Sequence, residues 1–105
     1  MLPKKNRLNL RFHRNRLDEQ GQVRHSPYFI IISADSSSSC FAILISRKLL
    51  RKAVARNRLK RQISELIRIN LQDLPTKDFL IIPKKKILED KSWQKNLIDM
   101  LRSTP

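Results

Sequence analysis

Hydrophobic and polar positions recur with two periods along this chain, and each period predicts a different kind of element. Residues 28–34 (YFIIISA) and 40–46 (CFAILIS) are short apolar runs rich in β-branched and aromatic side chains, as expected for strands. The Ser-rich segment between them predicts an antiparallel hairpin, and residues 21–26 add a short edge strand. A further apolar run at residues 78–82 (DFLII) predicts another strand, which Pro83 ends.

Apolar residues spaced three and four apart predict two amphipathic helices. The first covers residues 53–71, and its apolar stripe is Ala55, Leu59, Ile63, Leu66 and Ile67. The second lies near the C-terminus and has the stripe Leu88, Trp93, Leu97, Ile98 and Leu101. A shorter helix is expected near the start of the chain, running from a cap at Asn6 or Asn9 toward Asp18. Strands and helices in this order predict an α+β sandwich with helices packed on a sheet.

The chain length of 105 residues supports one domain, residues 1–105, with a basic N-terminal arm and helix at residues 1–20. A single glycine, Gly21, excludes a glycine-rich phosphate loop. A single cysteine, Cys40, excludes disulfide frameworks and cysteine-based zinc sites, and it fits a cytosolic location. No apolar run approaches the length of about 18 residues that a membrane-spanning helix needs, so none is expected.

Charge is the strongest signal in the composition, and it is concentrated in one half of the chain. Lys and Arg total 23 against 9 Asp and Glu, which gives a formal net charge of +14. Residues 1–61 hold 15 basic and 3 acidic side chains, whereas residues 62–105 hold 8 and 6. Such self-repulsion indicates an anionic partner, whether nucleic acid, an anionic membrane surface or an acidic protein. We expect this partner to meet the first half of the chain.

The densest charge lies in residues 46–68 (SRKLLRKAVARNRLKRQISELIR), where Glu65 is the only acid. On a helix, the apolar stripe takes up about a third of the circumference and leaves the rest to cations. Like charges at this spacing, and cations near a helix N-terminus, oppose helix formation, so the pattern indicates a negatively charged ligand. Arg predominates inside the helix, and its planar fork matches phosphate.

Two other interpretations of this helix fit its sequence less well. A solvated cationic face with no ligand is common, but a mixture this lopsided in charge argues against it. A helix lying on a membrane needs large apolar and aromatic residues beside its basic face, whereas this stripe is narrow and aliphatic.

The same segment resembles the protein component of bacterial ribonuclease P. The family's mark is a helix opening of the pattern Ala-Val-x-Arg-Asn-Arg-x-Lys-Arg, which stands here at residues 53–61 after Ser46, Arg47 and Lys48. The opening at residues 2–8 (LPKKNRL) and the strand sequence FLII after Asp78 are also similar to the family. The resemblance covers nearly the whole chain.

The resemblance implies a fold and a function. The fold is a mixed sheet of four strands with three helices, in the order α-β-β-β-α-β-α, with a left-handed crossover through residues 53–71 in place of the usual right-handed one. The implied protein is the small subunit of a ribonucleoprotein that removes the 5′ leader from precursor tRNA in the cytoplasm. Its RNA subunit carries the catalysis with bound Mg²⁺. The implied partners are ribonuclease P RNA and precursor tRNA, with no membrane and no small-molecule substrate.

The resemblance also assigns roles to particular residues. The implied RNA contacts are Arg47, Lys48, Arg51, Lys52, Arg56, Asn57, Arg58, Lys60, Arg61 and Arg68, with Lys4, Lys5 and Arg7 as a basic arm. The single-stranded leader is expected in a cleft between this helix and the sheet. The family's cleft aromatics fall at Arg14, Asp18 and Ile32 here, with Phe12 and Tyr28 nearby, so base stacking is expected to be weaker or relocated. The expected cleft residues are Phe12, Arg14, Tyr28 and Ile32. Leu49 or Leu50 replaces the family's usual loop glycine.

The protein's own residues predict no catalytic site and no metal site. The acids show no recognisable ligand spacing, and the adjacent pairs Asp18–Glu19 and Glu89–Asp90 point apart on a helix or strand. His13 and His25 are the candidates for acid–base work, but surface positions that help contact phosphate are the favoured interpretation.

Three functional hypotheses remain at this point. The first is an RNA-binding subunit of a tRNA-processing ribonucleoprotein. The alternative is a non-enzymatic RNA-binding protein, such as a ribosomal protein. The third is a protein-only nuclease, which predicts RNA cleavage by the purified chain alone.

Overall fold

The computed structural model describes residues 6–8, 21–36 and 39–104, and within them the chain forms one mixed sheet covered by helices. The strands are β1 (Gln22–His25), β2 (Phe29–Asp35), β3 (Cys40–Ile43) and β4 (Lys77–Pro83). The helices are α2 (Ala53–Ile69) and α3 (Trp93–Arg102), with short 3-10 helices η2 (Leu71–Asp73) and η3 (Lys85–Leu88). None of the helices in these ranges is long and apolar enough to cross a bilayer.

The sheet has the strand order β1-β2-β4-β3, so the last strand in sequence is inserted between β2 and β3. β2 pairs antiparallel with β1 and with β4, whereas β3 pairs parallel with β4. The prediction of a hairpin between residues 28–34 and 40–46 is therefore wrong, because β4 separates the two strands. The α+β class and the four-stranded mixed sheet are confirmed.

The central position of β4 follows from its composition. Phe79, Leu80 and Ile81 are all fully buried, so this strand is apolar on both of its faces. A strand of that kind gains most when it has a neighbour on each side and cover above and below. A local hairpin of β2 and β3 would leave β4 at an edge, where its apolar faces would remain partly in water.

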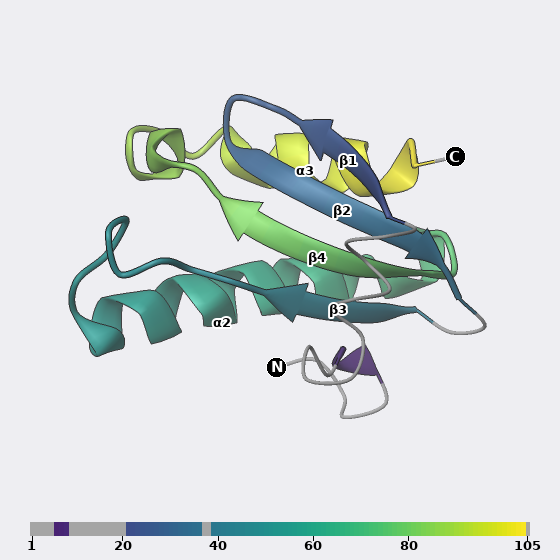
Figure 1. Ribbon diagram of the computed structural model, residues 1–105, viewed down its shortest axis with the longest axis horizontal. Helices are drawn as coiled ribbons and strands as arrows, with labels where there is room; N and C mark the ends of the chain where they lie inside the picture. The colour runs from purple at the N-terminus through teal and green to yellow at the C-terminus, as the bar shows by residue number, and fades with distance from the viewer. Residues whose placement is uncertain (1–5, 9–20, 37–38, 105) are drawn as a thin grey trace.

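Both helices lie on the same face of the sheet and enclose the main core (Figure 1). On α2, Leu59, Ile63 and Ile67 recur at four-residue spacing and are buried, as the sequence predicts. Trp93 opens α3 and packs edge-on against Phe29 with ring centroids 6.1 Å apart. The helix side of the sheet is therefore closed by side chains.

The opposite face of the sheet carries a smaller cluster of Leu8, Ile32, Ala34 and Leu80. Leu8 reaches it because residues 6–8 run along the outer edge of β3. Arg7 forms a parallel bridge with Phe41, and the Leu8 N–H donates to the Phe41 carbonyl at 2.8 Å.

Several boundaries differ from the sequence expectations. The β3 ladder ends at Ile43 rather than residue 46, although the Leu44 N–H still donates to the Ile81 carbonyl at 2.9 Å. Leu88 belongs to η3 and is half exposed, so it is no part of α3. Residues 6–8, 21–36 and 39–104 contain two longer helices, α2 and α3, so the predicted total of three is not confirmed. The third, predicted near the N-terminus, falls mostly within residues 9–20, outside the described residues. The left hand of the β3–α2–β4 crossover stays a prediction.

Truncation of Ile63 tests the packing of α2 on the sheet. Ile63 is fully buried, so Ile63→Ala should lower the free energy of unfolding by about 2–5 kcal/mol, through lost burial and the cavity it leaves. Val54 on the same helix is 71% exposed, and Val54→Ala should change stability by no more than about 0.5 kcal/mol. Urea denaturation measures both, and equal effects would show that the assigned faces of α2 are wrong.

Candidate nucleic-acid interface

Three basic segments lie at the same end of the sheet, the end at which β3 and β4 finish. We call this surface the basic edge. It consists of the loop at residues 47–52, the first turns of α2 at residues 53–61, and residues 84–86. β3 and β4 run parallel, so the segments that follow them leave the sheet on the same side. The last pair of this ladder is Ile43 with Ile81, which precede Ser46 and Lys84 by three residues each. These segments gather at the left of Figure 1.

The loop before α2 turns its leucines inward and its cations outward. The Ser46 carbonyl accepts hydrogen bonds from the N–H groups of Leu49 at 3.2 Å and Leu50 at 3.3 Å, which fixes the turn. Leu49 and Leu50 then pack against the main core. The four cations of the loop are exposed: Arg47, Lys48, Arg51 and Lys52. Within the described residues no φ is positive, so leucine is accommodated where the family usually has glycine.

The first turns of α2 present polar side chains opposite the buried stripe. The exposed residues there include Asn57, Arg58, Lys60 and Arg61. The helix begins after Lys52, which makes no side-chain capping hydrogen bond, and its first turn contains no acid. The free N–H groups and the helix dipole at this end favour an anion, while the cations here oppose the dipole. An anionic ligand at this surface would relieve that repulsion.

Two of the predicted RNA contacts on α2 are engaged within the protein. The half-buried Arg56 donates from Nη1 to two backbone carbonyls of the preceding loop. Arg68 forms an ion pair with Glu65, in which Arg68 Nε lies 3.0 Å from Glu65 Oε2. This hydrogen bond from Arg68 lowers the pKa of Glu65 to about 2. The charge of Arg68 is thus compensated by the only acid of the segment.

Lys84, Lys85 and Lys86 belong to the basic edge although the sequence analysis did not select them. Averaging over residues 62–105 gives nearly balanced charge, which hides this run directly after a strand. Lys84 and Lys85 have no acidic partner within the described residues. The run itself, placed just after Pro83, is the signal that could have found them.

Tyr28 lies beside this lysine run at the start of β2. Its backbone carbonyl accepts the Lys84 N–H at 2.7 Å, and Lys86 Nζ lies 5.6 Å from the ring centroid. The Tyr28 hydroxyl donates to Asp90 at 2.9 Å, and this hydrogen bond lowers the pKa of the Asp90 carboxyl. Asp90 also accepts the Ser92 N–H at 2.9 Å, so it holds the segment after η3 in place.

The predicted leader cleft is only partly visible, and its described residues do not come together. Tyr28 packs at the margin of the main core, whereas Ile32 belongs to the cluster on the opposite face. Phe12 and Arg14 lie outside the described residues, as do Lys4 and Lys5 of the basic arm. The contact between α2 and the sheet is filled by buried side chains, so no strand of RNA fits directly between them.

Arg7 is the described part of the basic arm. Its bridge to Phe41 places Arg7 along β3, and its side chain is exposed. Asn6 secures this position, because its buried side-chain amide donates to the Ser39 carbonyl at 2.6 Å.

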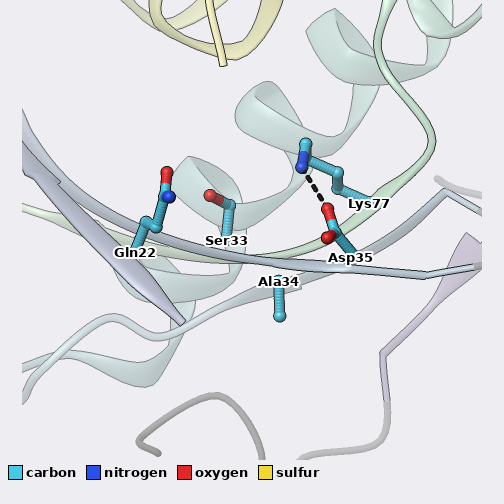
Figure 2. A pocket seen from close by; sticks show the side chains of 5 residues that line it. All are labelled: Gln22, Ser33, Ala34, Asp35 and Lys77. Atoms are coloured by element: carbon cyan, nitrogen blue, oxygen red, sulfur yellow. Dashed lines mark hydrogen bonds and ion pairs between the residues drawn. The ribbon is translucent and has the colours of Figure 1, made fainter. Parts of the chain in front are cut away.

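A shallow hollow lies at the other end of the sheet, with an empty volume of about 250 Å³ that includes space open to solvent. Figure 2 shows Gln22, Ser33 and the Asp35–Lys77 pair on one side of β2, with Ala34 pointing to the other. Lys77 Nζ lies 2.5 Å from the Asp35 carboxylate, and its hydrogen bond lowers the pKa of that carboxyl. The charges of Asp35 and Lys77 compensate each other, so we assign no ionic ligand to this hollow.

The described residues contain no group of three or more His, Cys, Asp and Glu side chains that could hold a metal ion. His25 is exposed on the edge strand β1, and His13 lies outside the described residues.

Comparison with known proteins agrees with this geometry. The sequence model of a family described as Ribonuclease P matches residues 2–103. The ribonuclease P protein component of Rickettsia rickettsii is 38% identical over 82 residues, which cover 66% of this chain and 70% of that protein. The component from Vibrio parahaemolyticus is 33% identical over 95 residues, covering 79% and 80%. The RNase P protein of Thermotoga maritima has a TM-score of 0.86 at 29% identity, covering 94% of this chain and 97% of that one.

The Glu65–Arg68 pair can be tested by titration. Arg68→Gln removes the charged donor, so the pKa of Glu65 should rise from about 2 toward its ordinary value of 4.5. NMR titration of the Glu65 carboxyl group in the wild-type protein and in Arg68→Gln measures this change. A Glu65 pKa that stays low in the variant would contradict the pairing.

Proposed function

This chain belongs to the ribonuclease P protein family, and we propose that it binds the RNA subunit of that ribonucleoprotein through the basic edge. Membership makes it the protein component of an endoribonuclease that processes the 5′ end of tRNA. What the proposal adds is the surface and the residues that make the contact.

The observation that carries the proposal is the exposure of many cations with no acid among them. Between Ser46 and Arg61 the chain has no Asp or Glu, and Glu65 beyond it is already paired with Arg68. Repulsion among these cations falls when phosphates neutralise them and counterions are released. The exposed contacts we assign are Arg47, Lys48, Arg51, Lys52, Asn57, Arg58, Lys60 and Arg61. We add the half-buried Lys84 and the exposed Lys85 after β4, and the exposed Arg7 on the outer edge of β3.

We also propose that precursor tRNA is the second RNA that meets this protein, through its single-stranded 5′ leader. The basic edge supports this, because it continues from α2 past the end of β4 to Tyr28. The side of α2 that faces the sheet is closed by buried side chains, so we place the leader along the exposed surface of the basic edge. Phe12 and Arg14 keep their expected role as leader contacts in this proposal.

The chemistry is assigned to the RNA subunit. Mg²⁺ bound there supplies the metal chemistry of leader removal, and this chain contributes binding and orientation of the two RNAs. The proposal places the protein in the cytoplasm with its RNA partners.

Charge reversal on α2 tests the assigned surface. Without this surface, the protein should no longer stimulate precursor-tRNA cleavage by ribonuclease P RNA at low Mg²⁺. The variant is Arg58→Glu with Arg61→Glu, which reverses the charge of two side chains on the exposed face of α2. The measurement is the cleavage rate with protein and RNA subunit together, and with each alone.

The control for this experiment is Lys95→Glu, which reverses an exposed charge on α3, outside the three segments that make up the basic edge. It should stimulate cleavage as wild type does, while Arg61→Glu alone should be weaker. Circular dichroism should show that the double variant, Arg61→Glu and Lys95→Glu are all folded. Cleavage by the protein without RNA would overturn the proposal, and so would equal loss in Lys95→Glu and Arg61→Glu.

The lysine run after β4 gives a separate test. Lys85→Gln removes one exposed cation and should weaken binding to ribonuclease P RNA or to precursor tRNA about fivefold at 0.1 M salt, the value of one phosphate contact. Lys95→Gln removes the same charge from α3 and should have no such effect. Filter binding with each RNA compares the two, and indistinguishable affinities would remove residues 84–86 from the interface.

A further inference from the structure

Arg56 differs from its neighbours Arg58 and Arg61 in where its guanidinium points. Its Nη1 donates to the Leu50 carbonyl at 2.9 Å and to the Arg51 carbonyl at 2.8 Å. The side chain is half-buried, whereas Arg58 and Arg61 are exposed. One nitrogen of the guanidinium is therefore committed to the protein's own backbone.

These two bonds close the loop onto the helix that follows it. At the start of the loop, the Ser46 carbonyl holds the N–H groups of Leu49 and Leu50. At its end, the Arg56 N–H donates to the Lys52 carbonyl at 3.1 Å, which begins the helix. Between these two points, the Arg56 side chain holds the carbonyls of Leu50 and Arg51. The loop is therefore fixed from Ser46 to the first turn of α2.

We infer that Arg56 is a positioning residue, which holds the loop so that Arg51 and Lys52 meet the RNA backbone together with the exposed face of α2. The inference rests on the proposed function of the basic edge. It replaces direct phosphate contact as the main role of Arg56 and explains why an arginine is needed there. A guanidinium is a rigid, planar donor, whereas the ammonium of lysine is a strongly hydrated point charge on a flexible stem.

Arg56 could affect RNA binding by ordering the loop or by neutralising a phosphate, and a variant that removes its charge would change both. Ordering the backbone of one residue costs about fivefold to thirtyfold in an equilibrium constant. A loop that is ordered only when RNA binds would therefore weaken binding by about this factor. Lysine keeps the positive charge, so the number of neutralised phosphates, and with it the salt dependence, should not change.

The experiment compares Arg56→Lys with Arg58→Lys in the full chain, with ribonuclease P RNA as the probe. Arg56→Lys should bind about tenfold more weakly than wild type, with the same slope of log affinity against log salt. Its backbone amides at residues 47–52 should exchange hydrogen faster in the free protein. Arg58→Lys should match wild type in slope and in loop exchange, because Arg58 is exposed and holds no part of the loop.

Two results would overturn the inference. One is Arg56→Lys binding and exchanging as wild type does. The other is the behaviour of a direct phosphate contact. In that case Arg56→Lys keeps wild-type affinity, and the slope of log affinity against log salt falls in magnitude by about 0.7 to 0.9 in Arg56→Gln. Equal melting temperatures of the two lysine variants show that general unfolding is not the cause.

Failure of the proposed function is distinguishable from failure of this inference. If the wild-type protein shows no salt-dependent affinity for the RNA, the basic edge is not the interface. The amide exchange of residues 47–52 is measured without RNA. Unchanged exchange in Arg56→Lys therefore overturns the ordering role of Arg56 in either case.

Discussion

The parallel pairing of β3 with β4 is the constraint on which the rest of this structure depends. A parallel pair requires a crossover, and α2 provides it, so the loop before α2 and the segment after β4 leave the sheet at one edge. β4 is held at the centre because it is apolar on both faces. The hydrophobic core thus determines that residues 47–52 and 84–86, which are distant in sequence, follow the same end of the sheet.

The basic edge is costly for the isolated protein. α2 begins without a side-chain cap and without an acid in its first turn, and each such omission costs up to about 1 kcal/mol. The buried side of the same helix offsets this, since each fully buried Leu or Ile contributes about 1.5–3 kcal/mol. Leu59, Ile63 and Ile67 therefore hold the cations in place against their mutual repulsion. The phosphates of an RNA backbone would remove that repulsion, so the charge pattern is favourable in the complex although it is costly in the free protein.

Local pattern predicted the elements well, and the structure shows where pattern stops being informative. The stripe of Leu59, Ile63 and Ile67 depends only on helical spacing, and it was predicted correctly. Strand pairing depends on competition among distant segments, so the predicted hairpin of β2 with β3 was wrong. The charge of Lys84–Lys86 was hidden by averaging over half the chain. The bonds of Arg56 to Leu50 and Arg51 depend on the path of the loop, which spacing alone does not give.

The most direct test of the account is the salt dependence of the affinity between the wild-type chain and ribonuclease P RNA. If the basic edge neutralises about 6 to 10 phosphates, the association constant should fall by roughly 10³ to 10⁵ between 50 and 200 mM salt. An association constant that hardly changes over this range would contradict the central claim, because binding would then not depend on the cations that the sheet brings together.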